Sequence, residues 1–173
     1  MAKLAFLGLG VMGYPMAGHL QAGGHEVTVY NRTSKKAQAW VKQHKGAMAA
    51  TVAEAVKNAE VVFACVGADQ DVFAITLGDN QNGEAGAFSA MAKGSVFVDN
   101  TTASAGGARK LSVAASERGI GFVDAPVSGG QAGAEGGIRF YARQSSLIYS
   151  MMAAGCKLGL SVNICIFLCC TDM

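Results

Sequence analysis

Short apolar runs alternate along most of this chain with segments whose apolar residues recur at helical spacing. Runs typical of strands buried on both faces occupy residues 3–7, 27–30, 61–66, 95–99 and 122–124. Helical spacing predicts helices over residues 11–22, 34–44, 51–58, 69–77, 87–92 and 105–118. Residues 78–86 follow neither pattern, and we expect a loop there. Regular βα alternation predicts an α/β fold, a doubly wound parallel sheet with helices on both faces.

The character of the sequence changes after about residue 135. Four of the five cysteines fall in the last 18 residues, and no strand or helix period is recognisable there. Residues 138–173 carry four charged side chains: Arg139, Arg143, Lys157 and Asp172. We therefore expect a folded domain over residues 1–135 and an atypical tail over residues 136–173, which resembles a truncated or frameshifted end.

Composition limits the classes of partner. The chain has 173 residues, 51% of them hydrophobic, which is enough for the core of one domain. The net charge is +2 without a basic block, so we expect neither a nucleic-acid nor a membrane partner. The first residues lack the pattern of a signal peptide, so we expect none, and the longest apolar stretch, residues 158–170, is shorter than the roughly 20 residues that span a bilayer. We expect a cytoplasmic protein, with no metal site because no paired CxxC spacing occurs.

A glycine motif, Gly-x-Gly-x-x-Gly, lies between the first strand and the first helix. In that context it predicts a dinucleotide site of the Rossmann type, whereas the pattern alone also fits a tight turn in a glycine-rich chain. Gly8 permits the sharp turn, Gly10 lets a pyrophosphate approach the backbone, and Gly13 lets the helix pack on the sheet. The predicted cofactor-binding residues of this turn are Gly8, Leu9, Gly10, Val11, Met12 and Gly13.

The end of the second strand distinguishes NAD from NADP. An NAD site usually carries an acidic residue about 20 residues past the glycines, where it binds the ribose 2′-hydroxyl. Here no acid is present, and Arg32 can pair with a 2′-phosphate through two hydrogen bonds. We therefore predict NADP, with NAD less favoured; the alternative is a solvated turn that binds no ligand. The residues that add donors are Asn31, Thr33, Ser34 and Lys36.

Residues 6–20 resemble the N-terminal signature of the β-hydroxyacid dehydrogenases, which include 3-hydroxyisobutyrate dehydrogenase and tartronate semialdehyde reductase. The Met-Gly-x-x-Met part of the segment goes beyond a general dinucleotide fingerprint. Three later segments, residues 65–72, 98–102 and 124–130, are similar to the same family in the expected order. The resemblance spans about residues 1–135.

The resemblance implies further site residues. Val66 and Gly67 would lie in a loop that passes the cofactor, and Thr102 would contact it near the nicotinamide. The segment with Ser128, Gly129 and Gly130 would cradle a substrate carboxylate, for which a hydroxyl and two backbone N–H groups are suited; the alternative is an ordinary glycine-rich loop. Met12 would border the nicotinamide. We interpret His19 and Trp40 as packing residues.

The activity implied by the resemblance is hydride transfer between NADP and a small 3-hydroxyacid or its semialdehyde, such as 3-hydroxyisobutyrate. The family's general acid/base is a lysine in a Gly-x-x-Gly-x-Gly-x-x-x-Lys setting, followed by an all-helical second domain. The only lysine beyond Gly130 is Lys157, whose surroundings do not match. We therefore name no catalytic residue and keep a second hypothesis, a non-catalytic dinucleotide-binding fragment or module. A homo-oligomer is left open.

Overall fold

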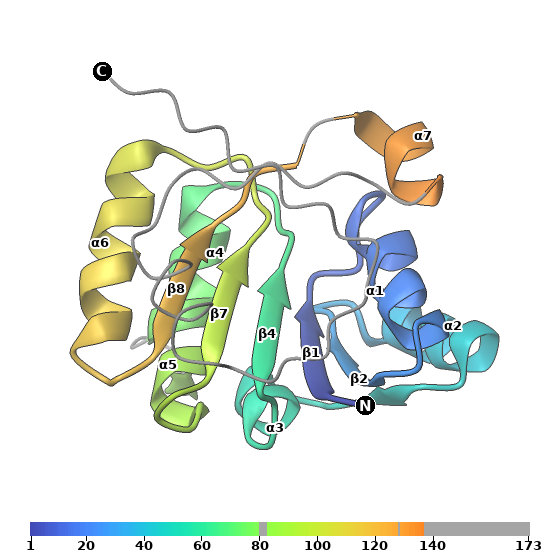
Figure 1. The fold of residues 1–173 in the computed structure, drawn as a ribbon, viewed down its shortest axis with the longest axis horizontal. Helices are drawn as coiled ribbons and strands as arrows, with labels where there is room; N and C mark the ends of the chain where they lie inside the picture. Colours follow the sequence, from blue (N-terminus) through green and yellow to red (C-terminus); the bar gives the residue numbers. More distant parts are fainter. Residues whose placement is uncertain (80–82, 128, 137–173) are drawn as a thin grey trace.

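Six parallel strands form the main sheet of this computed structural model, which describes residues 1–79, 83–127 and 129–136. Their order across the sheet is β3-β2-β1-β4-β7-β8, and the carboxyl ends point towards the top of Figure 1. The order reverses between β1 and β4, as the predicted doubly wound fold requires. The strands are β1 (Lys3–Leu7), β2 (Glu26–Tyr30), β3 (Ala47–Met48), β4 (Val61–Ala64), β7 (Val96–Asp99) and β8 (Gly121–Asp124).

Helices cover the sheet on two faces because successive strand residues point to opposite sides. In β1, Leu4 and Phe6 belong to the core with the first group of helices, whereas Ala5 and Leu7 belong to the core with the second group. The first group is α1 (Gly13–Ala22), α2 (Ser34–His44) and α7 (Gly130–Glu135). The second group is α3 (Val52–Val56), α4 (Asp69–Leu77), α5 (Ala87–Ala90) and α6 (Ala105–Ser116).

Local signals in the sequence place most of these elements correctly. The predicted capping box opens α3: the Thr51 hydroxyl accepts from the Glu54 amide, and the Glu54 carboxylate accepts from the Thr51 amide. Trp40, a residue of α2, is fully buried, as expected for a packing residue, and its indole N–H donates to the Tyr14 carbonyl. β4 ends at Ala64 rather than residue 66 because the Val66 amide donates to a side chain instead of a strand.

Four short elements were not foreseen. The two-residue β3 extends the sheet, and the six-residue α7 follows β8. The expected loop at residues 78–86 contains an antiparallel pair, β5 (Gly78–Asp79) with β6 (Glu84–Ala85). Elements of two to six residues are too short to show a hydrophobic period. They form through pairing with distant or facing segments. Almost all of the predicted tail lies outside the described residues, so its separate character stays a prediction.

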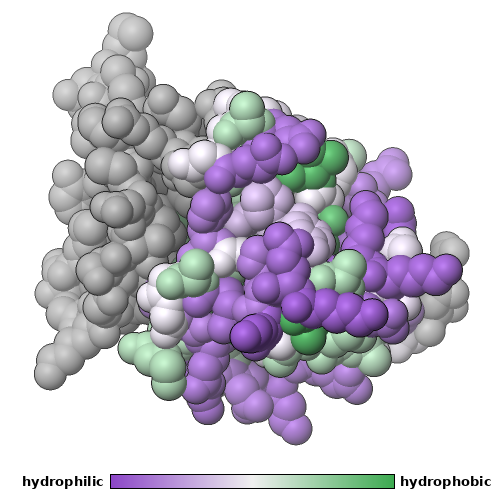
Figure 2. Space-filling model, turned by 90° about the vertical axis from the view of Figure 1, so that its right-hand side faces the viewer, coloured by the Kyte–Doolittle hydropathy of each residue, from purple (hydrophilic) through white to green (hydrophobic). Residues whose placement is uncertain are grey.

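The end of the molecule formed by α2 has a largely hydrophilic surface with only scattered apolar spots (Figure 2). This follows from the amphipathic pattern of α2, whose Ala37 and Trp40 are buried while Lys35, Lys36 and Lys42 are exposed. None of the helices in the described ranges is both long and apolar enough to cross a membrane.

Candidate dinucleotide site

The carboxyl ends of the strands bring four predicted segments to one edge of the sheet. The turn after β1, the end of β2, the loop after β4 and the loop after β7 all lie at this edge, around the point where the strand order reverses (Figure 1). Open α/β sheets bind their ligands in the crevice outside this edge. The fold therefore gathers the predicted cofactor residues at the position where a nucleotide is expected.

The three glycines of the turn after β1 meet different surroundings. Gly8 has φ +96°, and a side chain there would collide with the Cys65 carbonyl and reach within 2.9 Å of Val66. A side chain at Gly13 would collide with the Gly8 carbonyl, in agreement with the close helix packing expected there. At Gly10 an added Cβ meets no protein atom within 4 Å. Packing thus explains two of the glycines, while Gly10 is left for a ligand.

The amino end of α1 presents free amides. Tyr14 N–H is the first to bond inside the turn, to the Gly10 carbonyl, and no described residue accepts from the amides of Val11, Met12 and Gly13. The first turn carries no acidic side chain. Unpaired N–H groups and the helix dipole together favour a phosphate at this point. Val11 is 63% exposed, so the turn is open to solvent.

Leu9 and Asn31 brace the turn from behind. The Leu9 amide donates to Asn31 Oδ1 over 2.8 Å, and Asn31 Nδ2 donates to the Thr33 carbonyl over 3.1 Å. Leu9 itself is buried, so its amide is not available to a phosphate. The Asn31 side chain thus joins the glycine turn to the β2–α2 loop, and its contact with the cofactor stays a prediction.

The end of β2 presents cations to solvent. The Arg32 side chain is 91% exposed, Lys36 is exposed one turn into α2, and the first turn of α2 contains no acid. Thr33 occupies the N-cap position of α2 without using its hydroxyl as a cap. This group of donors at a helix amino end fits an anion.

Sequence reasoning missed Asp71, which lies on α4. Its carboxylate is 3.7 Å from the Arg32 guanidinium, and its Oδ2 would be 2.7 Å from a Cβ at Gly67. The acid therefore partly balances the cation next to the predicted phosphate site. Nothing in the spacing of the sequence signals this pairing, because it joins the loop after β2 to a helix that begins 37 positions later.

The loops after β4 and β7 are tied together by hydrogen bonds. Val66 N–H donates to the Thr101 hydroxyl over 3.1 Å, and Thr101 N–H donates to Asp99 Oδ1 over 2.9 Å. Farther out, the Asp69 carboxylate accepts from both the amide and the hydroxyl of Ser104. Gly67 and Thr102, the predicted cofactor residues of these loops, remain exposed.

Burial changes the acidity of two groups below these loops. It raises the pKa of Asp99 to about 6, against the lowering effect of the hydrogen bonds from Thr101. Burial also raises the pKa of the Cys65 thiol to about 11, and the negative charge of Asp99 adds to the effect. The Cys65 thiol is therefore protonated at neutral pH and is a poor nucleophile.

The segment predicted to bind substrate is anchored by Asn100. Asn100 is fully buried, and its Nδ2 donates to the Ala125 carbonyl over 2.9 Å. Gly129 and Gly130 have φ values of +116° and +59°, a region that favours glycine, and both are exposed. Ser128 lies outside the described residues. Asn100 was not singled out from the sequence, although it stands in the motif that contains Thr102.

His19 links α1 to the end of α7, in agreement with its interpretation as a packing residue. Its Nε2 lies 3.1 Å from the carbonyl oxygens of both Ala134 and Glu135. The contact therefore holds the far end of α7, the helix that begins within the predicted substrate segment.

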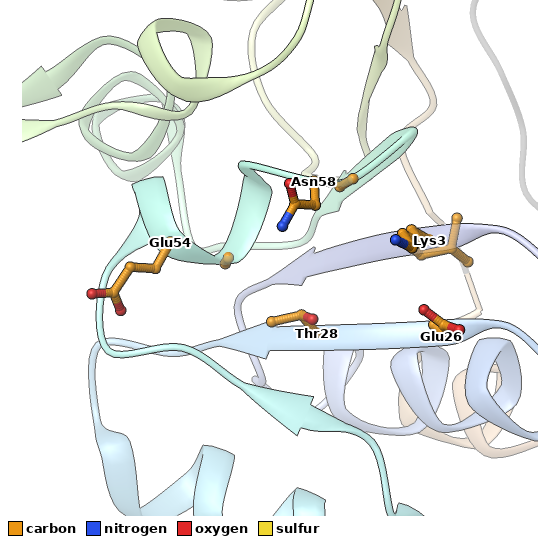
Figure 3. A pocket seen from close by; sticks show the side chains of 8 residues that line it. Lys3, Glu26, Thr28, Glu54 and Asn58 are labelled. Carbon is orange, nitrogen blue, oxygen red and sulfur yellow. The ribbon is translucent and has the colours of Figure 1, made fainter.

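A separate hollow of about 190 Å³ lies at the opposite end of the sheet (Figure 3). It is lined by the amino ends of β1 and β2, where Lys3 and Glu26 are register partners, and by Glu54 and Asn58. The glycine turn and the exposed Arg32 are at the other end of these strands. The hollow is thus not part of the candidate dinucleotide site.

The sequence matches the NAD binding domain of 6-phosphogluconate dehydrogenase over residues 3–143. The chain belongs to this family. The match begins at the first residue of β1, and it covers the glycine turn together with the loops after β4 and β7. A Rossmann-type dinucleotide-binding domain, predicted from the glycine motif and the βα alternation, is thereby confirmed.

Individual relatives of this family are oxidoreductases. An uncharacterized oxidoreductase of Shewanella frigidimarina is 52% identical over 137 residues, which is 79% of this chain and 45% of that protein. The 3-hydroxyisobutyrate dehydrogenase of Pseudomonas aeruginosa is 39% identical over 138 residues, covering 79% and 44%. The chain spans less than half the length of these two relatives.

A solved structure supports the same fold. Psf3 in complex with NADP⁺ and 2-OPP superposes with a TM-score of 0.74 at 27% identity, and the match covers 87% of this chain and 52% of that one. The family assignment and this likeness support an NAD(P)-binding oxidoreductase domain of the hydroxyacid-dehydrogenase type.

Proposed function

We propose that this chain binds NADP in preference to NAD, as the coenzyme domain of an oxidoreductase that acts on a small 3-hydroxyacid or its semialdehyde. The observation that carries the proposal is the end of β2, where the 91% exposed Arg32 stands beside the amino end of α2 and no acid occupies the first turn of that helix. A ribose 2′-hydroxyl has no carboxylate acceptor at the end of β2 or in the first turn of α2, whereas a 2′-phosphate gains a guanidinium and helix amides. The carboxylate of Asp71, on α4, lies 3.7 Å from the Arg32 guanidinium and balances only part of its charge.

The pyrophosphate would bind the free amides of Val11, Met12 and Gly13, with Gly10 leaving room for its approach. The nicotinamide half would then pass the exposed Gly67 and Thr102 on the two linked loops. When bound, the coenzyme supplies hydride chemistry. The chain's own residues hold its phosphates and fix the loops beside it.

For the substrate, the proposal uses the segment after β8. The backbone at Gly129 and Gly130 is exposed and left-handed, a geometry that directs successive N–H groups towards an anion. A carboxylate is the anionic group shared by 3-hydroxyacids and their semialdehydes. The 3-hydroxyisobutyrate dehydrogenase relative supports this class of substrate.

Coenzyme preference is tested by titrating the chain with NADPH and with NADH and following the fluorescence of the reduced nicotinamide. We expect NADPH to bind at least about tenfold more tightly, because a charge-assisted pair contributes roughly 1.5–3 kcal/mol. Arg32→Asp should reverse the preference, since it removes the cation and adds an acceptor for the 2′-hydroxyl. Lys42→Asp, a charge reversal in the last turn of α2, is the matched control and should leave the preference unchanged. Tighter binding of NADH by the wild type would refute the proposal.

Turnover of 3-hydroxyisobutyrate with NADP⁺ tests the second half of the proposal. Binding of NADPH without turnover would favour the alternative function, a coenzyme-binding module. That alternative draws on the sequence, in which Lys157 is the only lysine beyond Gly130.

A further inference from the structure

Asp99 and Thr101 lie beneath the two loops that flank the crevice. Asp99 is the last residue of β7 and is 1% exposed, and Thr101 in the following loop is equally buried. The Thr101 hydroxyl accepts from Val66 N–H, in the loop after β4. That loop in turn lies against the glycine turn, so closely that a Cβ at Gly8 would collide with Cys65 and Val66. The Thr101 hydroxyl thus joins the loop after β7 to the loop after β4, which itself packs against the phosphate-binding turn.

Asp99 supports this connection through the backbone of Thr101. A hydroxyl that accepts from an amide still has one proton to donate. The carboxylate of Asp99 is the acceptor beside it, since the Thr101 hydroxyl and amide both interact with that group. The Asp99 carboxylate accepts from the Thr101 amide over 2.9 Å and thereby holds Thr101 where its hydroxyl meets the Val66 amide.

This arrangement is unfavourable for folding alone. Asp99 Oδ2 is buried and has no hydrogen-bond partner in the described part of the chain. A buried carboxylate with an unpaired oxygen destabilises the native state relative to an amide or an apolar side chain of similar size. Perturbed carboxylates of this kind cluster at functional sites.

We propose that Asp99 and Thr101 form a positioning pair, which holds the loop of residues 65–68 in the shape that the nicotinamide half of the coenzyme requires. The pair does not touch the coenzyme; it acts through Val66 and sets the place of Gly67 and Thr102, the next residue on each loop. This inference rests on the proposed function, because it takes the coenzyme to be the ligand of these loops.

The test compares a whole coenzyme with its adenine half. Thr101→Val removes the hydroxyl at nearly constant volume. NADPH should then bind about tenfold more weakly, as expected for one lost hydrogen bond to an ordered amide. Adenosine 2′,5′-bisphosphate, which lacks the nicotinamide half, should bind within about twofold of its wild-type affinity. Hydrogen exchange at the Val66 amide should be faster in this variant.

Three further variants separate positioning from general destabilisation. Thr101→Ser keeps a hydroxyl and should restore NADPH binding. Thr76→Val is the matched control: it removes an equally buried hydroxyl, whose partners among the described residues are two carbonyls of its own helix. It should change the affinity for neither ligand. Asp99→Asn combined with Thr101→Val should weaken NADPH binding no further than Thr101→Val alone, because both residues act through the same contact with Val66.

Equal weakening of both ligands by Thr101→Val, or no rescue by Thr101→Ser, would overturn the positioning role. If the wild type instead prefers NADH, the proposed coenzyme preference fails. The same comparison is then made with NADH and with ADP, which lacks the nicotinamide half. Thr101→Val should again weaken binding of the whole coenzyme about tenfold and binding of its adenine half by less than about twofold.

Discussion

At the scale of single residues, Gly10 and Gly13 look alike in the motif but differ in their surroundings. A Cβ at Gly13 would enter the space of the Gly8 carbonyl and come within 2.9 Å of the Phe6 ring, whereas a Cβ at Gly10 meets nothing. Stability and ligand binding therefore separate cleanly between the two positions. One glycine keeps the helix against the sheet, and the other keeps the crevice open.

Alanine at each position should show this separation. Gly13→Ala should lower the free energy of unfolding by about 3 kcal/mol, because a backbone carbonyl cannot yield as a side chain can. Gly10→Ala should change it by less than about 0.5 kcal/mol, yet weaken NADPH binding at least about tenfold. Urea unfolding and fluorescence titration measure the two effects. An unaltered NADPH affinity in Gly10→Ala would show that the pyrophosphate does not approach the turn there.

The sequence was sufficient for residues whose role follows from local chemistry. The glycines of the motif and the cation at Arg32 could be predicted, because turn geometry and charge are properties of neighbouring residues. Asp71 and the engagement of Asn31 could not, since each depends on a partner in a distant segment. The same holds for Thr101, whose partner Val66 lies 35 positions away.

At the scale of elements, α4 and α6 are joined at their amino ends. Ser104 caps α6 by accepting from Gly107 N–H, and it also donates its amide and hydroxyl to the Asp69 carboxylate in the first turn of α4. These bonds lower the pKa of Asp69 below its usual range. The hydrogen bonds between Asp69 and Ser104 therefore hold the amino ends of the two helices together, outside the buried positioning pair.

Removing the Ser104 hydroxyl should weaken the connection between α4 and α6. Ser104→Ala should lower the free energy of unfolding by about 1 kcal/mol through the lost N-cap. It should also raise the pKa of Asp69 towards its usual range, as measured by NMR titration of the carboxyl carbon. Ser104→Thr keeps both roles of the hydroxyl and serves as the control. A pKa of Asp69 that stays low in Ser104→Ala would assign the effect to the backbone amide alone.

Elements with a clear period were predicted within one to two residues at most ends, because periodicity records which face is buried. The two-residue β3 and the β5–β6 pair have too few residues to carry a period. α7 begins in a glycine-rich stretch and depends on His19 for an anchor on α1. Its existence is thus a property of tertiary contacts rather than of its own six residues.

At the scale of the whole molecule, one buried acid sets a pH dependence of folding. The pKa of Asp99 is about 6 in the native state, above the value near 3.9 expected in the unfolded chain. Between these values the native state holds the proton more tightly than the unfolded state. The contribution of Asp99 to stability is therefore fully present below pH 4 and is lost as the pH rises through 6.

Asp99→Asn should remove this loss, because an amide does not ionise. The variant should gain free energy of unfolding relative to the wild type as the pH rises from 4.5 to 7.5, by up to about 3 kcal/mol. Urea unfolding of both proteins at several pH values measures this difference. Asp69→Asn is the control with the opposite sign: Asp69 has a lowered pKa, so its contribution to stability is present at neutral pH and lost on acidification. A difference between Asp99→Asn and wild type that stays constant with pH would mean that Asp99 titrates normally. The cost of burying its charge, on which the positioning argument draws, would then be absent.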